Sequence, residues 1–498
     1  MQDFERFRLR RFLESLGSEE LQKVETPVAL ADVAAALEGN PKAVWFSRAG
    51  PEAAELAGNV AGSRSRLAHA FGTTRERLLQ EVLSRLRAKP EIVEVSRAPC
   101  QEVVEKDPDL TALPVHLQHG LDGAPYISAS TDFTVDRETG WVNVGMRRLM
   151  LRGRREAGVD LVAPSDLRAI YLGQAKRGEP LPIAFVVGSH PIDHVAATMR
   201  IPTDEAGLIA SLRGAPLAVV KCLTSSLRVP ADAEYVLEGH LDPAGHVEPE
   251  GPYGEFLGYY GAVKRNPVFH LSAITHRRDA VFQTATIGGL ALGRTDTAQL
   301  CALRTEVTVW RSLETAVRET RAVYATASSG GMYNVRIALQ QRVPGEARNA
   351  IAAVFGSLAN AKHVFVVDPD IDVYSDEQVD WALATRFQAD RDLVVASGMR
   401  TLPLDPSLGG ASTGAKAGFD LTFKSSLSLE NRVPQAPRYE GRRFGSLQAA
   451  LADGPKYFGE LMAALGSRDG REIVRELETM RRAGQLSRDG EGRYQVTR

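Results

Sequence analysis

Six short β-rich runs between residues 125 and 320 constrain the fold of this chain more than any other feature of its sequence. Turn residues separate each run from the next. Short strands at this spacing are typical of a small barrel or sandwich, here with helical insertions such as Asp204–Leu212. The six runs are Tyr126–Phe133, Trp141–Met150, Ile183–Gly188, Leu217–Cys222, Ala233–Glu238 and Val268–Ile274.

The segment before this region alternates strand-like and helix-like patterns. Ala43–Phe46 is a short apolar run that predicts a strand, and Arg75–Arg87 has helical periodicity. This alternation indicates an α/β domain that ends near residue 115, where prolines begin to interrupt the chain.

The segment after residue 320 returns to α/β patterns. His363–Val367 predicts a buried strand. Ser375 with Gln378 predicts a capping box for a helix that runs to Arg386. A loop rich in glycine and serine is expected at Gly409–Gly418.

The last part of the chain has its own pattern. Residues 457–465 and 471–483 look helical, and Gln485–Val496 predicts two short strands around a turn, so the outline is that of a winged helix. Residues 467–498 hold eight arginines against six acids, a mild excess that makes nucleic acid an unlikely partner and favours a packing or oligomerisation role. A chain of 498 residues predicts two to four domains. We expect 1–115 as an N-terminal α/β domain, 116–320 as a β-barrel domain, 321–435 as a C-terminal α/β domain and 436–498 as an appendage.

The composition excludes two broad classes of partner. Hydrophobic residues make up 44% of the chain, charged residues 24%, and the net charge at neutral pH is -2. This balance gives no electrostatic basis for whole-chain binding to nucleic acid or an anionic membrane. The charged first residues lack the apolar core of a signal peptide, and no apolar stretch is long enough to span a membrane. The three cysteines have neither zinc-site nor disulfide spacing, so we expect a cytoplasmic enzyme.

The run Glu250-Gly-Pro-Tyr-Gly-Glu255 is the first candidate for chemistry. Two carboxylates bracket a turn that glycine and proline restrain. Beside a cation, one acid of such a pair stays ionised while the other carries a proton, which proton delivery to a carbanion requires. Taken alone, the same pattern is more often a solvated surface turn.

An arginine that could complete this pair lies upstream, in the strand-like run that ends at Arg148. Arg147 and Arg148 take opposite faces of a strand, so one of them could face a pocket and hold a substrate carboxylate.

Two weaker candidates for binding residues follow later in the sequence. Asp204 and Glu205 fall in the first turn of a helix, where capping is the default and cation ligation the sharper interpretation. Lys416, between two glycines, could reach a phosphate but lacks the full phosphate-loop pattern.

Four ordered elements between about residue 120 and residue 425 together resemble the UbiD family of prenylated-FMN-dependent (de)carboxylases. The elements are Trp141-Val-Asn143 with Arg148 five residues after the asparagine, Asp204-Glu205 before a helix ending in Leu-Arg-Gly and then Val-Val-Lys-Cys, Leu-Glu-Gly followed by the Glu250–Glu255 run, and Gly414-x-Lys416-x-Gly-x-Asp420.

The resemblance implies a mixed α+β fold and a cofactor. It implies a split β-barrel of the flavin-reductase type between two α/β domains, with the C-terminal domain used in homodimers or higher homo-oligomers. The implied cofactor is prenylated FMN from a separate flavin prenyltransferase, with its phosphate held through Mn²⁺ (or Mg²⁺) beside K⁺. By position, Asn143 and Glu205 match metal ligands, Lys416 matches a cofactor-contacting lysine, and Ala197 and Met199 fall where backbone carbonyls would meet the K⁺.

One departure concerns the third metal ligand, commonly a histidine in this family. The matching stretch, Leu161 to Arg168, has no histidine, and Asp166 falls nearest to that position. A carboxylate oxygen suits Mn²⁺ or Mg²⁺ and adds negative charge beside the phosphate. The resemblance therefore identifies Asp166 as the stand-in ligand.

The resemblance also implies a reaction. It is the reversible, non-oxidative decarboxylation of an aromatic, heteroaromatic or α,β-unsaturated carboxylic acid through a covalent substrate–cofactor adduct. Arg148 would hold the substrate carboxylate, Glu255 would donate the proton, and Glu250 would orient Arg148. Two alternatives are an FMN-dependent oxidoreductase, which would not need the three charged residues, and a non-catalytic or DNA-associated family member acting through its tail.

Overall fold

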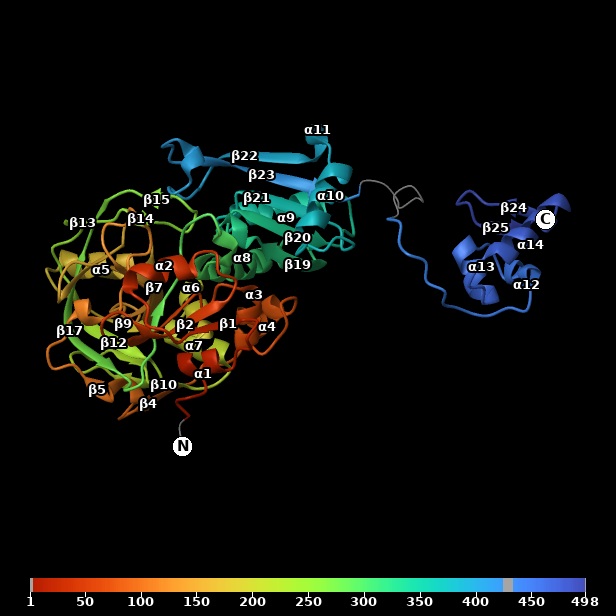
Figure 1. Cartoon of the computed structure of the whole chain (residues 1–498). Helices are drawn as coiled ribbons and strands as arrows, with labels where there is room; N and C mark the ends of the chain where they lie inside the picture. Colours follow the sequence, from red (N-terminus) through yellow and green to blue (C-terminus); the bar gives the residue numbers. More distant parts are fainter. Residues whose placement is uncertain (1–2, 424–432, 498) are drawn as a thin grey trace. The chain divides into compact units, whose positions relative to one another are not determined.

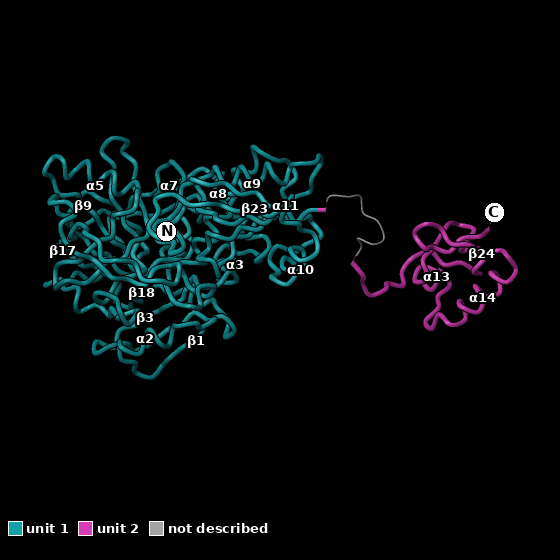
Figure 2. Tube along the Cα trace, turned by 90° about the horizontal axis from the view of Figure 1, so that it is seen from above, with its two compact units in different colours: residues 1–422 teal, residues 423–498 magenta. Residues whose placement is uncertain are grey.

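The computed structural model describes residues 3–423 and 433–497 of the chain (Figure 1). The chain divides into two compact units, Met1–Thr422 and Phe423–Arg498, each packed on itself (Figure 2). Helices and strands are mixed throughout the larger unit, which confirms the expected α/β class.

Six antiparallel strands in unit 1 form a closed barrel, which confirms the barrel expected from the sequence. Their order is β12-β9-β6-β7-β8-β17, and β17 pairs back onto β12 to close the ring. Closure removes the unpaired strand edges that an open sheet would leave. The barrel strands are β6 (Tyr126–Val135), β7 (Val142–Leu151), β8 (Glu156–Val159), β9 (Leu181–Val187), β12 (Tyr235–Leu241) and β17 (Val268–His276), and β5 (Val103–Val104) extends the sheet beyond β17.

The barrel wall separates two apolar cores. On β9, Ile183 and Phe185 belong to one core and Ala184 and Val186 to the other. Because both faces of β9 are buried, its sequence is a continuous apolar run rather than an alternating one. On the first side, the Phe185 and Phe269 rings meet edge to face with centroids 4.9 Å apart.

The N-terminal part of unit 1 forms a sheet that it does not complete by itself. The strand order is β1-β2-β3-β18, and β18 (Phe282–Thr284) comes from beyond the barrel to pair in parallel with β3. The other elements here are α1 (Leu9–Glu14), β1 (Leu21–Val24), α2 (Leu30–Leu37), β2 (Ala43–Ala49), β3 (Ala54–Gly58), α3 (Arg64–Ala70) and α4 (Leu78–Arg85).

One predicted β-rich run lies outside the barrel. The run Leu217–Cys222 forms β10 (Leu217–Lys221), but its hydrogen-bond partners are β4 (Ile92–Val95) and β11 (Arg228–Pro230). Because β4 belongs to the N-terminal part, this three-stranded sheet ties that part to the barrel region.

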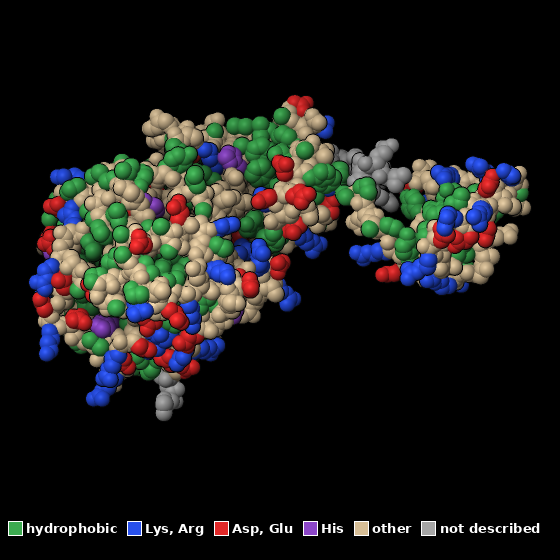
Figure 3. Space-filling model, viewed as in Figure 1, with side chains coloured by type: hydrophobic (Ala, Val, Ile, Leu, Met, Phe, Trp, Pro, Cys, Tyr) green, Lys and Arg blue, Asp and Glu red, His purple; other side chains and the backbone are tan. Residues whose placement is uncertain are grey.

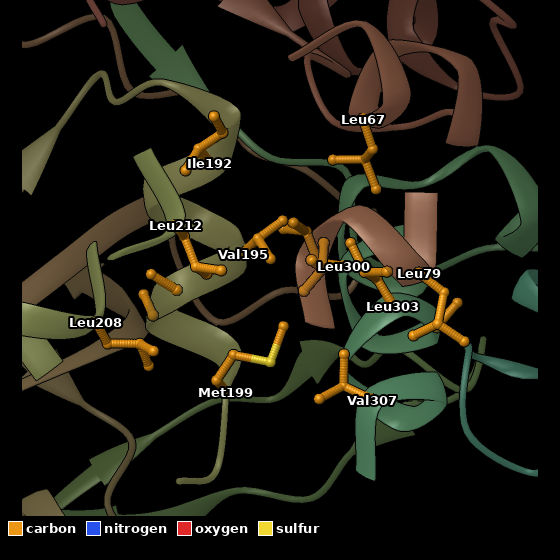
Figure 4. Close-up of a cluster of buried hydrophobic side chains, with 14 of the residues drawn as sticks. Leu67, Leu79, Ile192, Val195, Met199, Leu208, Leu212, Leu300, Leu303 and Val307 are labelled. Atoms are coloured by element: carbon orange, nitrogen blue, oxygen red, sulfur yellow. The ribbon is translucent and has the colours of Figure 1, made fainter. Parts of the chain in front are cut away.

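Helices from before, between and after the barrel strands build the largest apolar cluster (Figure 4). Leucine, isoleucine and valine recur at three- and four-residue spacing, as in Leu300, Leu303 and Val307 on α8, so each helix presents one apolar stripe. Stripes from α3, α4, α6, α7 and α8 meet in this cluster. Between barrel strands lie α5 (Asp166–Lys176), α6 (Pro191–Thr198) and α7 (Glu205–Arg213), and α8 (Asp296–Leu313) follows the last barrel strand.

A five-stranded sheet of order β19-β20-β21-β23-β22 forms the C-terminal part of unit 1. Figure 1 shows it beside α8 and α9. The predicted strand His363–Val367 is β21, and Ser375 caps the predicted helix by accepting a hydrogen bond from the backbone N–H of Gln378. The elements are β19 (Thr320–Ala325), β20 (Asn334–Leu339), α9 (Glu346–Gly356), β21 (His363–Val367), α10 (Asp376–Arg386), α11 (Ala389–Asp392), β22 (Leu393–Met399) and β23 (Gly414–Leu421).

The expectation of a loop at Gly409–Gly418 is wrong in its second half. Residues from Gly414 onward form β23, which pairs in parallel with β21 and antiparallel with β22. Gly418 lies directly under the side chain of Ile351 on α9, where a Cβ would clash. The glycine therefore lets a helix pack closely on the strand and does not mark a turn.

The described residues of unit 2 fold as three helices and a hairpin. The predicted helices and strands are present as α13 (Phe458–Leu465), α14 (Arg471–Arg482), β24 (Leu486–Arg488) and β25 (Tyr494–Val496), whereas α12 (Leu447–Ala452) was not predicted. Lys456 bridges to Tyr494 as a further pairing of the hairpin. The winged-helix outline expected from the sequence therefore describes this unit.

Across the described residues, none of the helices combines the length and the apolar character that crossing a membrane requires.

We predict that Arg213 is essential for the stability of unit 1. Its side chain is buried, with Nη2 2.5 Å from Asp193 Oδ2 on α6 and Nη1 2.6 Å from Asp232 Oδ2. Arg213→Ala leaves these carboxylates buried without their cation, which costs about 3–5 kcal/mol. Urea denaturation should show this loss in the free energy of unfolding. Arg137→Ala, which breaks an exposed pair with Glu179, should cost about 1 kcal/mol or less. Equal losses in the two variants would contradict the prediction.

Candidate active site

Two short hairpin ladders position the Glu250–Glu255 run beside the barrel. β13 (Glu248–Glu250) pairs with β16 (Lys264–Asn266), and β14 (Tyr253–Gly254) pairs with β15 (Tyr260–Gly261). Between them, Gly251 has a φ of 96°, a conformation that favours glycine. The turn is therefore held at both ends, and Glu250 and Glu255 are buried instead of lying on a solvated surface loop.

Arg148 on β7 joins the two glutamates. Its Nε lies 3.0 Å from Glu250 Oε1 and its Nη2 3.3 Å from Glu250 Oε2. Its Nη1 donates to Glu255 Oε1 at 2.9 Å. The structure thus brings Arg148, Glu250 and Glu255 together as one buried cluster, across more than a hundred residues of sequence.

Two further charged residues belong to the cluster and escaped the sequence analysis. Asp160, which directly follows β8, has Oδ2 2.9 Å from Arg148 Nη2. Lys264 on β16 has Nζ 3.2 Å from the same Asp160 oxygen and 3.5 Å from Glu255 Oε1. The signal that could have found Lys264 is the hairpin register, in which it lies directly opposite Glu250.

Two tyrosines cover the Arg148 guanidinium. The Tyr253 ring centre lies 4.5 Å from the guanidinium carbon and the Tyr126 ring centre 5.9 Å from it. Burial raises the pKa of Tyr253 well above its ordinary value, so its phenol stays neutral. Aromatic faces on a buried guanidinium add cation–π attraction and keep water away from the arginine.

The predicted metal ligands lie on a different part of the barrel. Asn143 on β7 donates a hydrogen bond of 2.8 Å to buried Asp132 on β6. Glu205, the first residue of α7, accepts one of 2.5 Å from the backbone N–H of Val144. Asp204 is the N-cap of the same helix, as the default interpretation expected.

The carboxylates near Asn143 repel one another. Burial, with Asp132 and Asp166, raises the pKa of Glu205 to about 8 against the opposing effect of the Val144 N–H. Asp166, the first residue of α5, therefore lies within electrostatic reach of Glu205. No cluster of three or more His, Cys, Asp or Glu side chains with metal-binding geometry occurs among the described residues. A metal here would need the Asn143 amide oxygen together with Glu205 and Asp166, a set of hard oxygen donors that suits Mn²⁺ or Mg²⁺.

The remaining cofactor candidates fall on α6 and β23. Ala197 lies in the last turn of α6, and Met199 is its C-cap. The Met199 side chain packs into the apolar cluster, so only its backbone could contact a ligand (Figure 4). Lys416 is buried on β23, and its Nζ donates a 3.0 Å hydrogen bond to the carbonyl of Phe355.

Lys416 belongs to a group of cations that the sequence analysis missed in part. Burial, together with Arg304 and Arg400, lowers the pKa of Arg200 to about 10. Burial and Arg400 also lower the pKa of Lys416. Arg400 donates to Asn360 Oδ1 at 3.0 Å, a neutral acceptor like the one that Lys416 uses. Four cations within electrostatic reach of one another could hold a phosphate.

A cavity of about 590 Å³ borders the Glu250–Glu255 run. It is lined by Gly254 and by His119, whose Nδ1 lies 3.0 Å from buried Asp122 Oδ2. Asp122 also accepts a hydrogen bond of 2.9 Å from the backbone N–H of Gly254. A volume of this size is within the range of small-molecule pockets.

The site combines a buried guanidinium with paired carboxylates close to a closed barrel. Comparison with known proteins identifies the chain as a carboxy-lyase of the decarboxylase type. Within that class it belongs to the UbiD family, as the resemblance predicted. The family model for the 3-octaprenyl-4-hydroxybenzoate carboxy-lyase Rift-related domain matches residues 91–290 of this chain. The family model for the carboxy-lyase C-terminal domain matches residues 298–421.

Similar proteins agree with this assignment. Anhydromevalonate phosphate decarboxylase of Methanosarcina mazei is 32% identical over 75% of this chain and 86% of its own length. Phenolic acid decarboxylase of Sedimentibacter hydroxybenzoicus is 31% identical over 83% of this chain and 91% of its own length. The UbiD-class enzyme HmfF of Pelotomaculum thermopropionicum, solved with FMN, superimposes with a TM-score of 0.80 at 32% identity and covers 86% of this chain and 97% of its own.

We predict that Gly254 cannot be replaced without displacing His119. A Cβ on Gly254 would lie 2.6 Å from Cγ and Cε1 of the imidazole, which Asp122 holds in place. Gly254→Ala should therefore lower the free energy of unfolding by about 1–3 kcal/mol, as overpacking typically does. Chemical denaturation measures this free energy. In the His119→Ala background the clash is absent, so adding Gly254→Ala should change the free energy of unfolding much less than it does in the unmodified chain. A Gly254→Ala variant as stable as the unmodified chain would contradict this geometry.

Proposed function

We propose that this enzyme reversibly decarboxylates an aromatic, heteroaromatic or α,β-unsaturated carboxylic acid with prenylated FMN. The observation that carries the proposal is the contact of Arg148 with both Glu250 and Glu255, because proton delivery after loss of carbon dioxide needs an acid beside a fixed cation. HmfF has been solved with FMN and, in an evolved dimeric form, with prenylated FMN, which supports the choice of cofactor.

The residues of this chain fit the phosphate end of such a cofactor. Lys416 with Arg200 and its two neighbouring arginines would hold the phosphate. Asn143, Glu205 and Asp166 would ligate Mn²⁺, and the backbone carbonyls of Ala197 and Met199 would meet K⁺. When bound, the prenylated flavin supplies an electron sink for the electron pair that the departing carbon dioxide leaves behind.

The side chains of the cluster then divide the work. Glu250 accepts hydrogen bonds from the N–H groups of Arg148 and Asn266. These contacts suit an ionised carboxylate, which orients Arg148. Arg148 keeps one N–H on Nη1 for the substrate carboxylate. Both donors to Glu255 contact its Oε1, and Oε2 has no donor among the described residues. A proton carried on Oε2 is therefore the one that Glu255 delivers to the vacated carbon.

Partners follow from the same proposal. A separate flavin prenyltransferase supplies the cofactor, and copies of this chain associate through the C-terminal sheet. Hydrophobic side chains gather over β22 and β23 on the face seen in Figure 3, and Val395 on the edge strand β22 is 60% exposed. An exposed apolar edge strand of this kind is typically covered by another chain.

The test of the function uses enzyme co-expressed with a flavin prenyltransferase. The mass and absorbance of the bound cofactor identify prenylated FMN, and unmodified FMN with NAD(P)H oxidation would instead favour an oxidoreductase. Carbon dioxide release is then measured with 4-hydroxybenzoic, 2-furoic and cinnamic acids as probes of the three substrate classes.

Glu255→Gln should lower carbon dioxide release and H/D exchange at the vacated carbon by about 10²–10⁴-fold, because the variant has no proton to give. Arg148→Ala should raise KM and lower kcat together, since it removes the carboxylate partner and releases both glutamates. Glu156→Gln, an exposed acid on β8, serves as the matched control and should leave both rates unchanged. Full exchange activity in Glu255→Gln would refute its role as the proton donor.

Glu205→Gln and Asp166→Asn should each weaken Mn²⁺ binding by about tenfold or more, because each replaces a charged oxygen donor. Electron paramagnetic resonance of free Mn²⁺ during titration measures the affinity. Glu205→Gln keeps a side-chain oxygen that can accept the hydrogen bond from the Val144 N–H, so the variant should retain the fold while losing the charged ligand. Unchanged affinity in Asp166→Asn would exclude this residue as the stand-in for the histidine.

A further inference from the structure

Lys264 occupies a defined place in the cluster without a role assigned so far. It lies opposite Glu250 in the β13–β16 ladder, so its side chain emerges on the same face as that glutamate. Its Nζ contacts Asp160 Oδ2 at 3.2 Å and Glu255 Oε1 at 3.5 Å. The Lys264 side chain is 23% exposed and that of Glu255 is 8% exposed, so the ammonium is the more solvent-accessible partner of the pair.

Five ionisable groups form the surroundings of Glu255, either in contact with it or in contact with its two cation partners, and each comes from a different segment of the fold. Three are acidic groups or a neutral phenol, and two are cations. They are Arg148 on β7, Asp160 after β8, Glu250 on β13, Tyr253 on β14 and Lys264 on β16.

The charges in this cluster leave one negative charge in excess. Three carboxylates, including Glu255, face two cations, which gives a net charge of -1. Burial acts to raise the pKa of Asp160, but Arg148 and Lys264 outweigh it and hold that pKa below its ordinary value. Asp160 is therefore ionised at neutral pH.

We propose that Lys264 is a positioning residue that sets the protonation state of Glu255, and that Asp160 acts against it. The inference rests on the proposed role of Glu255 as the proton donor. A cation next to Glu255 favours its ionised form, and an anion next to it favours its protonated form. Lys264 thus lowers, and Asp160 raises, the pH above which Glu255 has lost the proton that it must deliver.

The two residues predict shifts of opposite sign. Lys264→Met removes a cation, so the titration midpoint of Glu255 should rise by about one pH unit. Asp160→Asn removes an anion and frees both cations for Glu255, so the midpoint should fall. Lys264→Arg keeps the charge and should leave the midpoint close to that of the unmodified chain. A purely structural role would move both midpoints in the same direction or neither.

Carbon-13 NMR of the full-length protein, labelled at the glutamate carboxyl carbons, reads this titration without substrate or cofactor. Glu255→Gln identifies the signal by its absence. Lys221→Met, an exposed lysine on β10 outside the cluster, is the matched control and should not move it.

A midpoint in Lys264→Met that is equal to or below that of the unmodified chain overturns the inference. The upper limit of the pH–rate profile for carbon dioxide release should move with the NMR midpoint in each active variant. If no acid is decarboxylated, the proposed function fails while the NMR titration still decides the effect of Lys264 on Glu255. If decarboxylation proceeds and the midpoint does not rise in Lys264→Met, only the role of Lys264 fails.

Discussion

The guanidinium of Arg148 is the interaction on which the arrangement of the site depends. Its three nitrogens contact Glu250, Glu255 and Asp160, which come from separate hairpin segments and from the end of a barrel strand. Without that cation, two buried carboxylates and the partly buried Asp160 would face one another, which is costly at low dielectric. The closed barrel fixes β7 and β8, the hairpins fix the turn, and Arg148 joins these parts into one functional cluster.

The central barrel and the Glu–Arg–Glu set were predictable from the sequence for different reasons. Turn-separated β-rich runs predicted the barrel by pattern, and the structure confirms it except that Leu217–Lys221 pairs with β4 instead. Arg148, Glu250 and Glu255 were identified only through ordered motifs, because spacing alone favoured a surface turn. Asp160 and Lys264 carried no motif, and their position follows from strand register, which a single sequence does not reveal.

Composition misled most where small residues pack closely. Glycines around Lys416 predicted a loop, yet they belong to a strand whose Gly418 accommodates Ile351. The change matters for function, since a lysine held on a strand is a fixed point charge, whereas a loop lysine would have to be ordered by its ligand. Arg200, Arg304 and Arg400, dispersed in sequence, could not have been grouped with it before the fold was known.

The last strand of the N-terminal sheet carries a consequence for how the chain reaches its fold. β18 pairs with β3 although more than two hundred residues separate them, and the whole barrel lies between the two in sequence. During synthesis from the N-terminus, the edge of β3 therefore lacks its β18 partner until residue 284 has emerged from the ribosome. The N-terminal sheet is thus completed only after the barrel strands that follow it in the chain have been synthesised.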